Sequence, residues 1–99
     1  MLIGLILAAA AALAVVILAI VYFDDIVKWF RSRNDIKTAD KDNIAFTIKQ
    51  KMSSGNYRVV QGIFNKETDQ LVDGQVMQTN KVDDKLNEVH GNEELVIYD

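Results

Sequence analysis

Hydrophobic and polar positions divide this chain into two unlike stretches. Residues 2 to 23 contain no charged side chain, and residues 24 to 99 carry all 11 basic and 14 acidic side chains. An α-helix of 22 residues is about 33 Å long, which is enough to cross a hydrocarbon layer of about 30 Å. The pattern therefore predicts an N-terminal transmembrane helix followed by a polar part that folds in water.

The same run has two other interpretations, a cleaved signal peptide and a helix buried inside a folded domain. A signal peptide has a basic start, a shorter apolar core and a small-x-small cleavage site. Here no basic side chain precedes the run, and the run ends in Ile-Val-Tyr-Phe, residues 20 to 23. These features favour an anchor that stays in the mature protein.

Aromatic and basic residues gather on the C-terminal side of the run, as they do at a membrane interface. The predicted interfacial anchor consists of Tyr22, Phe23, Lys28, Trp29, Phe30, Arg31 and Arg33. The same residues could instead bind a neighbouring protein. Because basic residues stay on the cytoplasmic side, we expect a single-pass protein with its N-terminus outside and its C-terminal domain in the cytoplasm.

Small residues recur inside the apolar run at helical spacing. Gly4, Ala8 and Ala12 are four residues apart, and Ala19 follows seven later. On one continuous helix they would share a face and let a second membrane helix approach closely. We therefore expect these four residues to form a membrane helix contact.

The polar part changes its period along the chain. Residues 44–52, 57–64 and 71–79 combine β-branched, aromatic and polar residues and are separated by turn residues, which predicts three strands. Val82, Leu86 and Val89 follow the spacing of a short helix, and residues 94–98 close the chain as a strand. The expected core is Phe46, Ile48, Val60, Phe64, Val76, Leu86, Val89 and Ile97.

The predicted fold class is a single N-terminal transmembrane α-helix plus a small α+β domain with an antiparallel sheet in the order β-β-β-α-β. The transmembrane helix and its juxtamembrane extension would occupy residues 1–31, a polar linker 32–43 and the head domain 44–99. Polar or small residues within the expected strands could line an open sheet edge, or could simply face water: Gln61, Gly62, Asp73, Gly74 and Gln75.

The residues that carry chemistry are sparse. Cysteine is absent and histidine occurs once, at His90, so we expect neither a metal site nor a catalytic residue. No glycine-rich phosphate loop occurs, and we expect no cofactor. Residues 38 to 99 hold 7 basic and 11 acidic side chains, whereas nucleic-acid-binding proteins usually present basic surfaces, so we expect no nucleic-acid partner. An acidic patch around the predicted helix could be solvated surface or could dock a basic partner: Asp83, Asp84, Glu88, Glu93 and Glu94.

These observations favour a non-enzymatic function. The leading hypothesis is a membrane-anchored interaction module, an accessory, assembly or stabilising subunit of a larger membrane protein complex whose partners are other membrane protein subunits. The alternative is a self-associating structural membrane protein with a homo-oligomeric head. A third hypothesis is an enzyme or ligand-binding regulator with a pocket that the sequence does not reveal.

Overall fold

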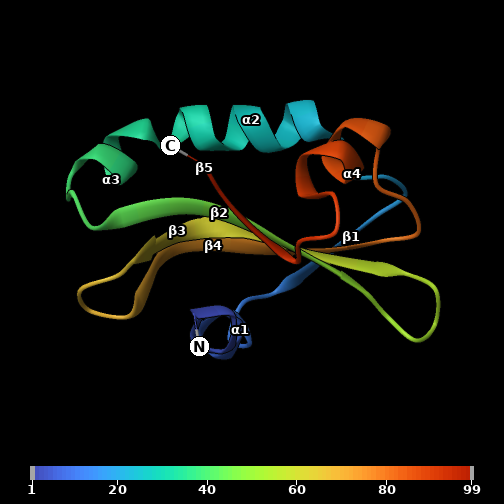
Figure 1. Cartoon of the computed structure of the whole chain (residues 1–99), viewed down its shortest axis with the longest axis horizontal. Coiled ribbons are helices and arrows are strands. Elements are labelled where there is room, and N and C mark those ends of the chain that lie inside the picture. The colour runs from blue at the N-terminus through green and yellow to red at the C-terminus, as the bar shows by residue number, and fades with distance from the viewer. Residues whose placement is uncertain (1, 99) are drawn as a thin grey trace.

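A computed structural model describes residues 2–98 of the chain, and Figure 1 shows the arrangement of its helices and strands. The elements follow in the order α1 (Leu2–Ala10), β1 (Val15–Leu18), α2 (Phe23–Ser32), α3 (Asn34–Thr38), β2 (Asn43–Lys51), β3 (Tyr57–Asn65), β4 (Gln70–Thr79), α4 (Asp84–His90) and β5 (Leu95–Tyr98).

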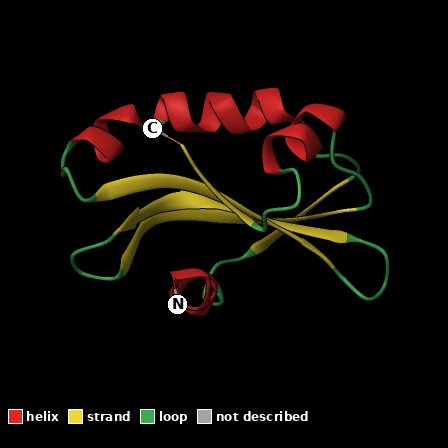
Figure 2. Cartoon of the chain, in the orientation of Figure 1, coloured by secondary structure: helices red, strands yellow, loops and turns green. Residues whose placement is uncertain are grey.

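Five strands form one mixed sheet with β3 at its centre and the spatial order β1-β4-β3-β2-β5. β2, β3 and β4 are a meander of antiparallel strands, β5 is antiparallel to β2, and β1 runs parallel to β4. Helices cover both faces of the sheet: α1 lies on one side, and α2, α3 and α4 lie on the other (Figures 1 and 2).

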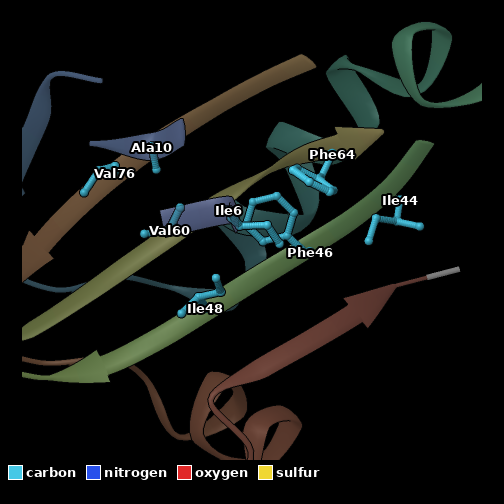
Figure 3. Packing of buried hydrophobic residues seen from close by; sticks show 8 residues of the cluster. All are labelled: Ile6, Ala10, Ile44, Phe46, Ile48, Val60, Phe64 and Val76. Atoms are coloured by element: carbon cyan, nitrogen blue, oxygen red, sulfur yellow. The ribbon is translucent and has the colours of Figure 1, made fainter. Parts of the chain in front are cut away.

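The first hydrophobic core lies between α1 and the sheet. Ile6 is fully buried against inward-facing residues of β2, β3 and β4, and Figure 3 shows the eight members of this cluster, Ile6, Ala10, Ile44, Phe46, Ile48, Val60, Phe64 and Val76. Complete burial of an isoleucine side chain stabilises a fold by about 1.5–3 kcal/mol. The N-terminal helix is therefore part of the hydrophobic core.

The second core lies on the opposite face, beneath α2 and α4. It contains Val21, Ile26, Val59, Met77, Val82 and Leu86. A buried amide fastens α2 to the centre of the sheet, because Gln61 Nε2 donates to the Ile26 carbonyl at 2.8 Å. Gln61 in turn accepts a hydrogen bond from Gln75 at 2.8 Å, so its two polar atoms are both paired.

The predicted fold class is wrong in its membrane-spanning part. The chain is a small mixed α/β domain, and the N-terminal helix has only nine residues. Within residues 2–98, we find no helix that combines the length and the apolar composition needed to cross a membrane. The single-pass span predicted from the sequence is therefore wrong. The predicted orientation, with the N-terminus outside and the C-terminal domain in the cytoplasm, depended on that span and is wrong as well.

The sheet explains why the apolar run does not continue as one helix. α1 ends at Ala10, and the chain turns through Ala11–Leu13, where the Leu13 amide donates to the Ala10 carbonyl at 2.9 Å. The next residues, Val15, Val16 and Ile17, are β-branched and suit a strand better than a helix. Here their backbone groups pair with the edge of β4, which supplies the hydrogen-bond partners that a strand needs.

The predicted positions of the later elements agree with the structure. β2, β3, β4, α4 and β5 occupy the predicted ranges to within one or two residues. The sheet is not purely antiparallel, however, because β1 adds a parallel fifth strand that the sequence pattern did not predict. Residues 32–43, the predicted linker, include α3 and the turn that leads into β2.

Replacing Gly62 with alanine should destabilise the fold. Gly62 lies opposite Gly74 in the β3–β4 pair, and an added Cβ would lie 2.6 Å from the Asp73 carbonyl oxygen. Overpacking of this kind costs about 1–3 kcal/mol. Urea unfolding followed by circular dichroism should show this decrease in the free energy of unfolding.

Gly4→Ala is the matched control. A Cβ at Gly4 would meet nothing within 4 Å, and alanine is about 0.5–1 kcal/mol better than glycine inside a helix. Gly4→Ala should therefore leave stability unchanged or raise it slightly. If Gly62→Ala were as stable as the wild type, the close approach of β3 and β4 would be incorrect.

Candidate functional site

The outer side of β1 is a free edge of the sheet. β1 pairs with β4 alone, from Val15 opposite Val76 to Leu18 opposite Thr79. Among the residues that the structure describes, no second strand and no further backbone hydrogen bond occupies Val15–Leu18. Such an edge presents N–H and C=O groups with which a strand of another chain can pair.

The side chains of β1 are apolar and exposed on both faces of the sheet. Their exposed fraction ranges from 38% for Leu18 to 78% for Ile17. Among residues 2–98, six of the eight exposed large hydrophobic residues precede Phe23: Leu5, Val15, Val16, Ile17, Leu18 and Tyr22. The fold therefore buries one part of the N-terminal apolar run and leaves another part at this edge.

The surface beside Ile17 and Leu18 is uncharged, whereas Arg58 lines a hollow next to Val15. A shallow hollow of about 170 Å³ adjoins the strand and is lined by Ile17, Leu18, Ala19, Asn56, Gln78, Thr79 and Asn80. Many proteins protect an edge strand with lysine, proline or a bulge, and the sequence Val-Val-Ile-Leu of β1 contains neither residue. This edge is suited to pairing with an uncharged extended segment.

The opposite edge, at β5, is better protected. Tyr98 packs against α2, with its ring centroid 5.3 Å from that of Phe30 and 6.4 Å from that of Phe23. Glu93 and Glu94 immediately precede the strand and give that edge negative charge. A second copy of the chain would meet like charge from Glu93 and Glu94 at β5, whereas β1 itself carries no charged side chain.

The residues predicted to form a membrane helix contact do not share one helical face. Gly4 and Ala8 lie on the exposed side of α1, whereas Ala12 and Ala19 lie in a turn and a bend outside any helix. The continuous small-residue stripe required one helix through residues 2–23, and the structure replaces that helix with α1 and β1.

The predicted interfacial anchor residues belong to α2 and its two ends. Phe23 and Phe30 face the sheet and contact Tyr98. Arg33 stacks 4.0 Å from the Trp29 ring centroid and forms an ion pair with Asp73 at 2.8 Å. Tyr22, Lys28 and Arg31 are exposed. Several of these side chains thus hold α2 to the sheet.

Asp83 of the predicted acidic patch has a structural role. Its two carboxylate oxygens accept from the amides of Phe23 at 3.1 Å and Leu86 at 2.9 Å, so one side chain caps the first turns of both α2 and α4. Asp84, Glu88, Glu93 and Glu94 are exposed around α4. Docking of a basic partner by the acidic patch stays a prediction.

His90 belongs to a buried chain of hydrogen bonds. Its Nδ1 lies 2.9 Å from the Glu93 carbonyl, which can only accept, so Nδ1 carries the proton. Nε2 therefore accepts from the Thr47 hydroxyl at 2.7 Å, and the Tyr98 hydroxyl donates to Thr47 at 2.7 Å. This chain ties α4, β2 and β5 together.

Burial sets the titration of this hydrogen-bond chain. Desolvation lowers the pKa of His90 below its usual 6.5, and the positive charge of Lys49 lowers it further, against the hydrogen bond to the Glu93 backbone. Burial also raises the pKa of Tyr98, against its hydrogen bond to Thr47. Thr47 is fully buried, so its hydroxyl holds the fold together and does not face a substrate.

Among residues 2–98, no three acidic or histidine side chains gather as they would around a metal ion. No protein-family model, curated protein or solved structure matches this chain.

Sequence reasoning missed the β1 edge, because it read residues 15–18 as the middle of one helix. The signal that could have revealed the edge is the run of three β-branched residues, Val15, Val16 and Ile17. The residues proposed for an open edge lie elsewhere: Gln61 and Gly62 are on the central strand, paired with Gln75 and Gly74.

Replacing Asp83 with alanine should destabilise the protein by about 1–3 kcal/mol, because the first turns of two helices lose their cap. Asp84→Ala is the matched control, since Asp84 is the next residue and is exposed; it should change the free energy of unfolding by less than about 1 kcal/mol. Equal losses in the two variants, measured by urea unfolding, would show that Asp83 does not cap both helices.

The stability of the protein should fall as the pH decreases below 6.5. The unfolded chain binds a proton at His90 near its usual pKa of 6.5, whereas the folded chain resists protonation until a lower pH. The contribution is complete above 6.5 and decreases by at most about 1.4 kcal/mol per pH unit, until the folded-state pKa is passed.

The check is urea unfolding of the wild type and His90→Gln at several pH values between about 5 and 8. The variant is expected to be less stable at neutral pH and to lose less stability on acidification, because it has no imidazole to protonate. Parallel pH profiles for the two proteins would mean that His90 titrates normally.

Proposed function

We propose that this chain is a non-enzymatic, self-associating interaction module in which β1 of one copy pairs with β1 of a second copy. The observation that supports the proposal is a free strand edge with four exposed apolar side chains and an uncharged hollow beside Ile17 and Leu18. Strand addition at such an edge is a general mode of protein association.

A second copy fits this edge without any further requirement. Around a twofold axis, the two β1 strands run antiparallel, and the same patch serves both partners. In the register centred on Ile17, Ile17 faces Ile17 of the second copy and Val16 faces its Leu18, so each cross-strand pair is apolar.

Charge is compatible with this arrangement even though the chain has a net charge of −3. β1 itself carries no charged side chain, although Arg58 lies beside Val15 in the hollow that both line. A four-residue edge is short, and interfaces below standard size are typically weak or transient. We therefore expect the dimer to have a dissociation constant in the micromolar range.

The accessory-subunit hypothesis stays a prediction that the structure does not address. A strand from another protein could use the same edge, and the outcome of the experiment below separates the two cases. A stable homodimer favours the self-associating module, whereas a strict monomer leaves the edge to a different partner and contradicts our proposal.

The proposal predicts that Ile17→Lys weakens dimerisation. Ile17 is 78% exposed, so lysine there should leave the fold intact while placing two positive charges against each other across the paired strands. Analytical ultracentrifugation of the wild type at up to ~100 μM should show a concentration-dependent dimer, and the variant should weaken it at least tenfold.

Ile97→Lys is the matched control, because Ile97 is 46% exposed on β5 at the opposite edge. It should dimerise like the wild type. Hydrogen exchange should also slow at the β1 amides as the protein concentration rises. Loss of the dimer in Ile97→Lys but not in Ile17→Lys would overturn the proposed interface.

A further inference from the structure

An open hollow of about 440 Å³ lies on the α1 side of the sheet. Seven of its nine lining residues are apolar, Leu7, Ala10, Ala11, Leu13, Val15, Val60 and Val76, and the other two are Gln50 and Arg58. Pockets of about 300–1,000 Å³ with mostly apolar walls and a few polar groups are typical of sites for small organic ligands.

Arg58 reaches the hollow because of the two-residue period of β3. It lies two residues before Val60, which belongs to the core under α1, so the two side chains share that face of the sheet. α1 and Leu13 cover the sheet at Val60 and Val76. The guanidinium therefore lies beside these apolar side chains.

The Arg58 guanidinium lacks a counterion within the described part of the chain. Its Nε is buried without a hydrogen-bond partner, and the one ion pair found among residues 2–98 joins Arg33 to Asp73. Gln50, the other polar residue of the hollow, uses its amide nitrogen on Glu94 at 3.0 Å. No acidic side chain of residues 2–98 lines the hollow.

A guanidinium without a counterion attracts an anion, and the part of Arg58 that lines the hollow can meet one there. A guanidinium presents its donors in a fork that matches a carboxylate. A small inorganic anion would leave the apolar side chains of the hollow in contact with water. A hydrocarbon tail would cover them.

We propose that this hollow binds a small monocarboxylate with an apolar tail, such as a medium-chain fatty acid. The carboxylate pairs with Arg58, and the tail lies along Leu7, Leu13 and Val76. The site is separate from the proposed dimer edge except at Val15, which lines the hollow and also belongs to β1.

The test is calorimetric titration of the full chain with decanoate. Decanoate should bind with one site per chain, whereas decanol, which lacks the charge, and acetate, which lacks the tail, should each bind at least tenfold more weakly. Arg58→Met replaces the charged guanidinium side chain with an apolar side chain of similar length. It should weaken decanoate binding at least tenfold. Arg58→Gln should behave likewise, and circular dichroism verifies that both variants fold.

Arg31→Met is the matched control. It removes the same charge from an exposed arginine on α2, which lines a different hollow on the opposite face of the sheet. Decanoate affinity should not change in this variant. The proposal is overturned if the wild type does not bind decanoate, if decanol binds as tightly as decanoate, or if Arg31→Met weakens binding as much as Arg58→Met.

The result does not depend on the proposed dimer. Ile17→Lys leaves every residue of the hollow in place and should bind decanoate like the wild type. A failure of dimerisation with intact decanoate binding would contradict only the proposed function, and the reverse outcome would contradict only the binding site.

Discussion

The structure depends on the packing of the N-terminal apolar run against both the face and the edge of the sheet. Ile6 fills the core under α1, and β1 extends the sheet beside β4. A small domain buries a smaller fraction of its surface than a large one and has little stability to spare. Without this segment, Phe46, Val60 and the other residues of the first core would face water.

The later part of the chain was predictable because its local signals and its tertiary environment agree. Alternation placed β2 and β3, and helical spacing placed α4, although Val82, the first residue of that predicted stripe, precedes the helix and pairs with Val21. Ile97 was assigned to the core by the same alternation but is 46% exposed, because β5 is an edge strand that α1 does not cover. Alternation identifies a face of a strand and does not show whether another element packs on it.

The N-terminal run was mispredicted because an uninterrupted apolar stretch is compatible with a membrane helix and also with a short helix followed by a strand. The choice depends on a partner far along the chain, since β1 pairs with β4 some sixty residues later. The free edge and the Arg58 hollow were missed for the same reason. Each exists only where β1, β3 and β4 come together.

The most direct test of this account is the pairing of β1 with β4 in solution. Nuclear Overhauser contacts in the labelled full chain should join the backbones of Val16 and Met77, which are partners in the parallel register. Such contacts, together with extended-strand couplings from Val15 to Leu18, are the predicted result. A continuous helical pattern from Leu2 through Ile20, without contacts to β4, would contradict it.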